Sequence, residues 1–294
     1  MFHFLINIFL TLILTQAGGL ANQTLPISLE ADLISFNTEA AELTLAADKA
    51  YVQSLDNRAF FYTKKADEVQ PIASITKLMT ALVFLDHNPG WEEVYTITKD
   101  DSIEGGRLNL FLGEKVKIKD ILATALIASD NGATLALVSA SGLSRAEFVS
   151  EMNLKASALG LKQTKFFDPT GLDDANVSTA REVALLAKEA LPRPEIQELV
   201  RLKEYHFTTE NGREKKIEST NYLLFDTEEN DFTVLGAKTG YTDRAGYCFV
   251  GRFADKDGRE IISVVLNSDG RNERFRESKQ LINWVFNNYH WAAR

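Results

Sequence analysis

The feature that most constrains the fold is the position of the strand-like stretches, which lie at both ends of the chain around a helical middle. Near the N-terminal end, Ala50–Ser54 and Ala59–Thr63 are separated by a short Asp-Asn turn. Near the other end, Tyr247–Ala254 and Arg259–Leu266 flank a turn that ends in Gly258. Such turns between alternating stretches predict β-hairpins. We therefore predict an α+β fold in which an antiparallel sheet is flanked by helices and carries an inserted helical lobe.

Helical periodicity fills the middle of the chain and its last residues. Apolar residues recur there every three to four positions, which is the period of a helix with one buried face. Two Ser/Thr-x-x-Glu sequences predict helix starts with capping boxes. The predicted helices run from Pro71 to His87, over Lys119–Ser129 and Ala133–Ala140, from the capping boxes Ser144–Glu147 and Thr179–Glu182, and along a final face from Leu281 to Tyr289.

The first residues resemble a secretory signal. Phe2–Leu14 is an apolar run of about 13 residues, long enough for a signal peptide but shorter than a bilayer span. We predict a signal peptide over residues 1–21, a flexible lead-in over 22–45 and one enzymatic domain over 46–294. An uncleaved membrane anchor and a buried N-terminal helix remain alternatives, because the segment before the apolar run has no Lys or Arg. The expected location is the periplasm or another extracytoplasmic space.

Composition excludes several functional classes. The 294 residues include 32 basic and 41 acidic side chains, for a net charge of −9. Nucleic-acid binding needs concentrated positive charge, so we expect no nucleic-acid partner. The single cysteine, Cys248, cannot form a disulfide within the chain and is expected to be a small buried residue. The four histidines form no HExxH sequence, which disfavours a zinc hydrolase.

Ser74 and Lys77 form the first candidate catalytic pair. Positions three apart on a helix are neighbours, so the hydroxyl and the amine can meet. Burial disfavours the charged form of a lysine, and a neutral lysine beside a serine is a plausible base for a nucleophile. The alternative is a Ser at a helix N-terminus with an exposed Lys.

Two further motifs carry candidate residues. Ser129-Asp130-Asn131 lies at a break between predicted helices, where side chains can point into a cleft. S-x-N also occurs at Ser35 and Ser219, so position alone selects the middle copy. Lys238-Thr239-Gly240 follows a strand-like stretch. The alternative interpretation of this motif is a lysine on an edge strand that is followed by a glycine in a turn.

In combination, S-x-x-K, S-D-N and K-T-G are the signature of penicillin-binding proteins and serine β-lactamases. From about Lys49 to Trp284 the sequence resembles the low-molecular-weight D-alanyl-D-alanine carboxypeptidases, which implies a β-lactamase/transpeptidase-like fold. The likeness rests on the segments Pro71–Leu82, Phe167–Leu172, Lys238–Thr242 with Ala245–Tyr247, and Arg274.

The resemblance implies a role for each motif residue. Ser74 would attack the carbonyl between two D-alanines and Lys77 would accept its proton, with Ser129 relaying a proton and Asn131 orienting Lys77. Repulsion from Lys238 would lower the pKa of Lys77. The substrate-binding residues implied are Lys238, Thr239, Gly240, Tyr241 and Arg274, with the N–H groups of Ser74 and Tyr241 as the oxyanion hole. The implied substrates are peptidoglycan stem peptides, the implied inhibitors are β-lactam antibiotics, and no metal or other cofactor is expected.

Three departures from the family pattern stand out. Asp168 replaces the usual Asn of the N-P-x-G-L loop, and Gly105-Gly106-Arg107 stands where the family has Ser-Gly-Ser. Only 20 residues follow Arg274, so we expect no C-terminal membrane anchor.

Other activities fit parts of the pattern. A DD-endopeptidase would use the same residues, since the crosslink D-Ala–diaminopimelate also places a carboxylate beside the scissile bond. A serine β-lactamase is less favoured, because no E-x-x-L-N segment lies between Asn131 and Lys238. A catalytically silent wall-binding module is the alternative from another class.

Overall fold

The computed structural model describes residues 34–56, 59–102, 108–226 and 230–291. The predicted signal peptide, the lead-in up to residue 33 and the Gly105–Arg107 segment lie outside the described residues. Within those residues, no helix combines the length and the apolar character that crossing a bilayer requires.

A five-stranded antiparallel sheet joins the two ends of the chain. The strand β2, near the N-terminal end, pairs with β12, near the C-terminal end, with Val52 opposite Ser263. The strands, in sheet order, are β10 (Phe232–Thr242), β11 (Gly246–Asp255), β12 (Glu260–Ser268), β2 (Lys49–Ser54) and β3 (Phe60–Lys64). The expected hairpins β2–β3 and β11–β12 are confirmed.

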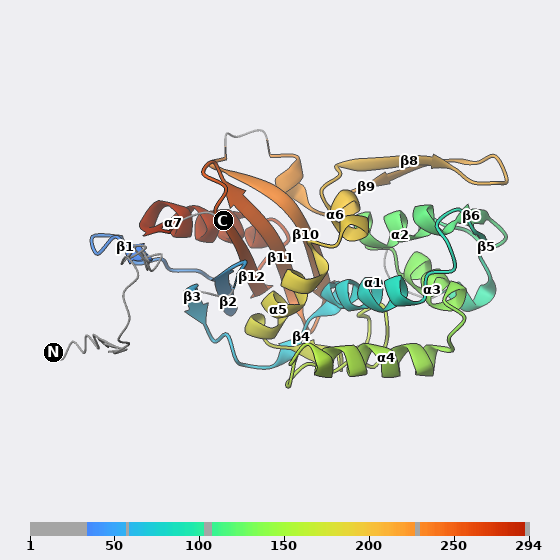
Figure 1. Cartoon of the computed structure of the whole chain (residues 1–294), viewed down its shortest axis with the longest axis horizontal. Helices are drawn as coiled ribbons and strands as arrows, with labels where there is room; N and C mark the ends of the chain where they lie inside the picture. Colours follow the sequence, from blue (N-terminus) through green and yellow to red (C-terminus); the bar gives the residue numbers. More distant parts are fainter. Residues whose placement is uncertain (1–33, 57–58, 103–107, 227–229, 292–294) are drawn as a thin grey trace, which may run out of the picture. The chain divides into compact units, whose positions relative to one another are not determined.

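Helices form the remaining layers (Figure 1). One long C-terminal helix, α7, packs on one face of the sheet, and the helical lobe lies on the other face. The helices are α1 (Lys77–Asp86), α2 (Ile118–Ile127), α3 (Asn131–Ala140), α4 (Arg145–Ala158), α5 (Ala180–Ala190), α6 (Pro194–Val200) and α7 (Glu273–Asn288), with 3-10 turns η1 (Ala73–Thr76), η2 (Lys99–Asp101) and η3 (Tyr222–Leu224).

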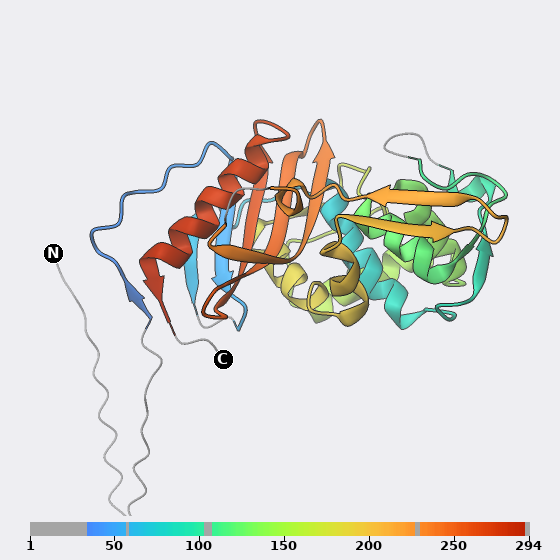
Figure 2. The same cartoon turned by 90° about the horizontal axis from the view of Figure 1, so that it is seen from above.

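Short strand pairs complete the architecture, which is the predicted α+β fold with an inserted helical lobe. They are β1 (Ser35–Phe36) with β13 (Tyr289–His290), β4 (Gln70–Pro71) with β7 (Val177–Ser178), β5 (Val94–Thr96) with β6 (Lys115–Lys117), and β8 (Glu204–Thr208) with β9 (Glu214–Glu218). Figure 2 shows the β8–β9 hairpin running along the helical lobe.

The sheet separates two hydrophobic cores because side chains alternate between its faces. Val250 and Val264 join the core shared with α1 and α5, whereas the neighbouring Phe249 and Val265 join the core under α7. The buried Cys248 belongs to the first core, and burial raises the pKa of its thiol to about 11. Edge strand β10 lies at the side of the sheet where the helical lobe begins.

Of the two predicted capping boxes, one forms and the other does not. Ser144 and Glu147 form the predicted reciprocal capping box of α4. At α5 the prediction of a capping box is wrong, although the side chain of Thr179 accepts a hydrogen bond from the Glu182 N–H. The Glu182 carboxylate instead accepts hydrogen bonds from the N–H of Gln163 and the hydroxyl of Thr164, because those partners compete for it.

The segment just before the sheet, predicted as part of a flexible lead-in, makes defined contacts from residue 35 onward. Strand β1 pairs with β13. The Trp284 indole N–H donates to the carbonyl of Ala41 at 2.9 Å, and Leu45 is buried in the core under α7. These contacts tie the segment to the C-terminal helix.

Candidate active site

Ser74 and Lys77 meet at the junction of η1 and α1. Ser74 lies in the 3-10 turn rather than in the first turn of the α-helix, and Lys77 is the first residue of α1. Their Oγ and Nζ atoms are 3.0 Å apart. Ala73, just before the serine, has φ of 48°, a left-handed conformation that costs a non-glycine residue energy. This turn is therefore held in an unusual shape by its surroundings.

The amine of Lys77 is buried among fixed hydrogen-bond acceptors. Its Nζ lies 2.7 Å from Asn131 Oδ1 and 2.7 Å from the carbonyl oxygen of Thr170. The residue is 1% exposed, and burial lowers the pKa of Lys77 to about 7 although Asp168 and Asp130 favour its charged form. A neutral amine has two N–H groups and one lone pair. With both N–H groups directed to Asn131 and Thr170, the lone pair is left for the hydroxyl of Ser74.

Ser129 and Lys238 form a second pair from different parts of the chain. The Nζ of Lys238, on β10, donates to Ser129 Oγ at 2.7 Å. Ser129 lies in the connection between α2 and α3 and has φ of 59°, again left-handed. Asp130 follows it and caps α3 by accepting a hydrogen bond from the N–H of Ala133 at 2.8 Å. The cap thus fixes the turn that presents Ser129 and Asn131.

The two buried lysines influence each other's pKa. Burial lowers the pKa of Lys238 well below its usual value, and repulsion from Lys77 and Arg274 lowers it further. We expected this repulsion to lower the pKa of Lys77. The repulsion is mutual, and at Lys77 the carboxylates of Asp168 and Asp130 favour the charged form against the effect of burial.

Two glycines allow neighbouring segments to approach η1, which carries the predicted nucleophile Ser74 and is called the nucleophile turn below. A Cβ at Gly171, which has φ of 85°, would lie 2.0 Å from the carbonyl oxygen of Ala73. A Cβ at Gly240 would lie 2.8 Å from the carbonyl oxygen of Ile72 and 3.2 Å from the Ser74 nitrogen. Gly240 lies within β10, not in a turn after an edge strand. Both positions need glycine because backbone packs directly on backbone.

The loop with Asp168 is organised by its carboxylate. Asp168 accepts hydrogen bonds from the N–H of Gly171 at 3.0 Å and from the Asn176 amide at 2.9 Å, and it also bonds the Thr170 hydroxyl. Asn176 in turn donates to Thr76 Oγ1 at 3.2 Å. The residue that departs from the family pattern therefore shapes the loop whose Thr170 carbonyl bonds Lys77.

The remaining predicted substrate-binding residues continue along β10 and onto α7. Thr239 Oγ1 lies 2.7 Å from Thr220 Oγ1, and the Arg274 guanidinium donates to the carbonyl of Gly240 at 3.0 Å. Burial lowers the pKa of Arg274 to about 10. Tyr241, half exposed, stacks on Tyr247 with ring centroids 4.3 Å apart. Ser74, Lys77 and Asn131 thus share one network, Ser129 and Lys238 a second, and Arg274 meets β10 through its backbone.

Sequence reasoning missed two groups in this site. The Thr170 carbonyl bonds Lys77, and a backbone acceptor has no sequence signature. Thr220 touches Thr239 only because the chain folds back between β9 and β10. No group of three or more His, Cys, Asp or Glu side chains in the described part of the chain is placed to hold a metal ion.

Comparison with solved structures supports the fold. The Streptomyces K15 DD-transpeptidase superposes with a TM-score of 0.76 at 28% identity, covering 84% of this chain and 99% of the other. Penicillin-binding protein D2 of Listeria monocytogenes, in its ampicillin-bound form, superposes with a TM-score of 0.72 at 34% identity over 84% of this chain and 99% of the other. The fold is therefore that of the β-lactamase-like DD-peptidases.

Sequence comparison places the chain among serine peptidases of the cell wall. A D-alanyl-D-alanine endopeptidase of Escherichia coli K12 is 31% identical over 251 residues, 84% of this chain and 80% of the relative. The D-alanyl-D-alanine carboxypeptidase DacC of the same organism is 36% identical over 233 residues, 75% of this chain and 56% of the relative. The profile of the peptidase S11 family, described as D-alanyl-D-alanine carboxypeptidase, matches residues 36–270. The chain belongs to this family of low-molecular-weight penicillin-binding serine peptidases.

Proposed function

We propose that this chain removes the terminal D-Ala from peptidoglycan stem peptides through an acyl-enzyme on Ser74. The observation that carries the proposal is the environment of Lys77. A buried amine with a pKa near 7 and two acceptors for its N–H groups has a lone pair for the Ser74 hydroxyl at 3.0 Å. That arrangement suits a general base for a serine nucleophile.

The reaction has two halves. Ser74 Oγ forms a bond to the carbonyl carbon as its proton passes to Lys77 Nζ. When the C–N bond breaks, the leaving amine takes a proton that passes through the Ser129 hydroxyl. Water then attacks the ester, loses a proton to the same base and releases the shortened peptide, and Ser74 regains its proton.

The substrate-binding roles follow the groups beside this centre. Lys238, Thr239 and Arg274 would hold the terminal carboxylate, and Gly240 lets β10 lie against the nucleophile turn. The N–H groups of Ser74 and Tyr241 would bind the oxyanion, a contribution typically worth ~3–4 kcal/mol per donor. Two basic side chains, Lys238 in β10 and Arg274 beside it, favour an anionic substrate terminus.

A second candidate, cleavage of peptidoglycan crosslinks, is favoured by the relatives. Three of them, from Escherichia coli, Haemophilus influenzae and Pseudomonas aeruginosa, are named D-alanyl-D-alanine endopeptidase, and this chain covers 80%, 74% and 77% of their lengths. It covers 56% of the carboxypeptidases DacA and DacC of E. coli. The chemistry at Ser74 is the same for both candidates.

The proposal extends to location and domain organisation. Enzymes of this family act in the extracytoplasmic cell wall. Residues 1–21 would export the chain to the periplasm or an equivalent space, and residues 46–294 would form the enzymatic domain. Residues 22–45 would form the lead-in between them, whose part from Ser35 onward packs against α7 and β13.

A fluorescent penicillin tests the acyl-enzyme. We expect covalent labelling of the wild-type protein, which is similar to a Listeria protein solved in its ampicillin-bound form, and no labelling of Ser74→Ala. The variant should remain folded, since the side chain makes one hydrogen bond to Lys77, worth about 1 kcal/mol. A wild-type protein that stays unlabelled would overturn the proposal and leave the silent wall-binding module as the better explanation.

A further inference from the structure

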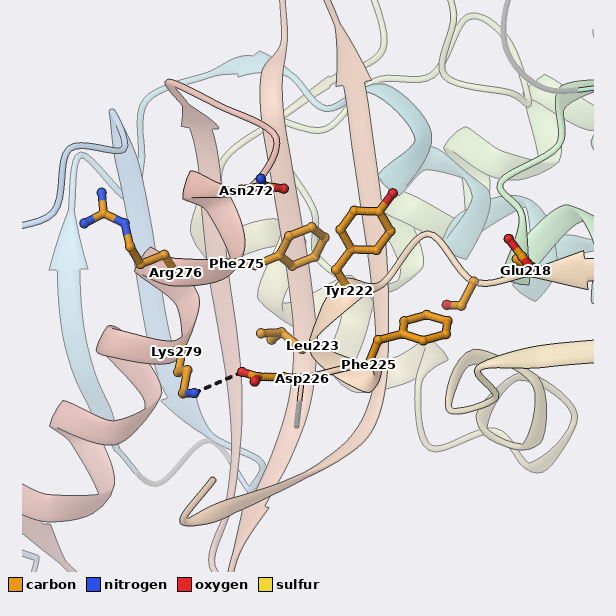
Figure 3. A pocket seen from close by; sticks show the side chains of 10 residues that line it. Glu218, Tyr222, Leu223, Phe225, Asp226, Asn272, Phe275, Arg276 and Lys279 are labelled. Carbon is orange, nitrogen blue, oxygen red and sulfur yellow. Dashed lines mark hydrogen bonds and ion pairs between the residues drawn. The ribbon is translucent and has the colours of Figure 1, made fainter. Parts of the chain in front are cut away.

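A pocket of about 670 Å³ lies between η3 and the first turns of α7 (Figure 3). Three aromatic rings, those of Tyr222, Phe225 and Phe275, line it together with charged side chains that include Glu218 and Lys279. Tyr222 and Phe225 are 38% and 43% exposed. Several large aromatic side chains that are partly exposed to solvent in one pocket are typical of a binding site.

The aromatic wall is held in place by its neighbours. Tyr222 stacks on Phe275 with ring centroids 5.5 Å apart, and the Arg271 guanidinium lies 4.8 Å from the Tyr222 ring. On the other side, Lys279 pairs with Asp226 at 2.9 Å, as the dashed line in Figure 3 marks. The surface is therefore formed before any ligand arrives.

Two residues that line the pocket are chain neighbours of residues that contact the proposed carboxylate-binding part of β10. Ser219 lines the pocket, and the next residue, Thr220, contacts Thr239 at 2.7 Å. Phe275 also lines it, and the preceding Arg274 donates to the carbonyl of Gly240. The Arg274 Nε is buried and has no hydrogen-bond partner among the described residues. The residues that follow Ser219 and precede Phe275 in the chain thus contact β10 at Thr239 and Gly240, which sets the pocket beside the proposed carboxylate-binding residues.

The leaving group of each candidate reaction differs at this point. A terminal D-Ala carries only a methyl group and a carboxylate. In a crosslink, the leaving amine belongs to a diamino acid that carries a carboxylate too, and its alkyl chain continues into a second stem peptide. If Thr239 and Arg274 hold the carboxylate, the alkyl chain needs an apolar surface beside them. The second stem peptide, which follows the alkyl chain, needs charged groups further away.

We propose that the pocket between η3 and α7 is the leaving-group subsite for a crosslinked peptide, receiving the alkyl chain against its aromatic wall and the released stem peptide along its charged rim. This proposal rests on the proposed function and assigns crosslinks as substrates of the same Ser74 centre. Side chains of both signs at the rim, among them Glu218, Asp226, Arg276 and Lys279, suit a peptide that carries both amines and carboxylates.

Phe225→Ala tests the subsite with defined muropeptides. Purified crosslinked dimers and monomeric pentapeptides are digested separately, and kcat/KM for each is measured by mass spectrometry. We expect the dimer-to-monomer ratio to fall about tenfold, which corresponds to ~1.4 kcal/mol of lost transition-state contact. Phe225→Leu, which keeps an apolar side chain, should recover most of the ratio.

Phe60→Ala is the matched control. Phe60 is 65% exposed on β3, at the opposite edge of the same sheet, so its removal should leave the ratio unchanged. An unchanged ratio in Phe225→Ala would overturn the subsite, as would a wild-type enzyme that digests monomers but not dimers. Neither result contradicts the proposal of an acyl-enzyme on Ser74, which penicillin labelling of the same samples tests independently.

Discussion

The proposed acylation centre and the proposed leaving-group side of this site are built in opposite ways. Around Ser74, the Lys77 amine is buried and hydrogen-bonded to Asn131 and Thr170. On the leaving-group side, the Arg274 Nε is unpartnered within the described residues and the pocket rings are half exposed. The contrast suggests that the groups that make and break bonds are enclosed before substrate binds, which avoids reorganisation during reaction, while the leaving-group surface stays open to solvent until substrate covers it.

The strongest test of the acylation centre is Lys77→Arg. A guanidinium keeps its proton at any working pH and cannot act as a base, so penicillin acylation should fall by about 10³-fold, within the range of a lost general base. Stopped-flow labelling measures the rate, and circular dichroism checks that the variant folds. Lys64→Arg, at a lysine that donates to the carbonyls of Leu45 and Ala47, should acylate normally. Near-normal acylation by Lys77→Arg would refute lysine-base catalysis.

Gly240→Ala tests the contact where the two sides meet. The added Cβ would lie 2.8 Å from the Ile72 carbonyl oxygen, so β10 must move away from the nucleophile turn. A displacement of about 1 Å can cost ~100-fold in rate, and we expect a loss of that order for peptide hydrolysis and for penicillin acylation.

Gly270→Ala serves as the control, because its Cβ would meet the flexible Glu273 side chain at 3.0 Å rather than backbone. If Gly240→Ala keeps wild-type kinetics, β10 does not need to lie against the turn.

The smallest expected effect concerns pH. With the pKa of Lys77 at about 7, the neutral base becomes more abundant as pH rises, so acylation should increase through neutral pH. The charge of Asp168 raises the pKa of Lys77. Asp168→Asn removes that charge and should shift the rising limb of the pH–rate profile to lower pH. The loss of one hydrogen bond in this variant should cost about 1 kcal/mol of stability.

The pH–rate profile separates this electrostatic role from a structural one, which would lower the plateau without moving the limb. Asp86→Asn removes a charge at the far end of the same helix α1 and should leave the limb in place. A limb that stays fixed in Asp168→Asn would show that the carboxylate only shapes its loop.

The predictable parts of the molecule are those set by local periodicity and short motifs. The i, i+3 spacing anticipates the contact of Ser74 with Lys77, the Ser144 capping box forms as expected, and the strands at both ends meet in one sheet. The β8–β9 hairpin was not predicted, although Asn211-Gly212 between its strands is a typical hairpin turn.

The rest depends on contacts between distant segments. The carboxylate of Glu182 accepts a hydrogen bond from Thr164 instead of forming the predicted capping box. Thr220 contacts Thr239 because the chain folds back between β9 and β10, which residue spacing does not predict. The pKa of Lys77 depends on its burial and on the nearby carboxylates of Asp168 and Asp130, which only the packed structure brings there.

The pairing of β2 with β12 also has a consequence for how the protein is made. The early hairpin β2–β3 has no β12 to pair with until that much later strand has been synthesised, and such long-range pairing forms late. Lys238 on β10 also follows the helical lobe in the sequence, so a partly synthesised chain already contains Ser74 yet lacks this strand. The proposed active site is therefore assembled only after β10 and β12 have both been made.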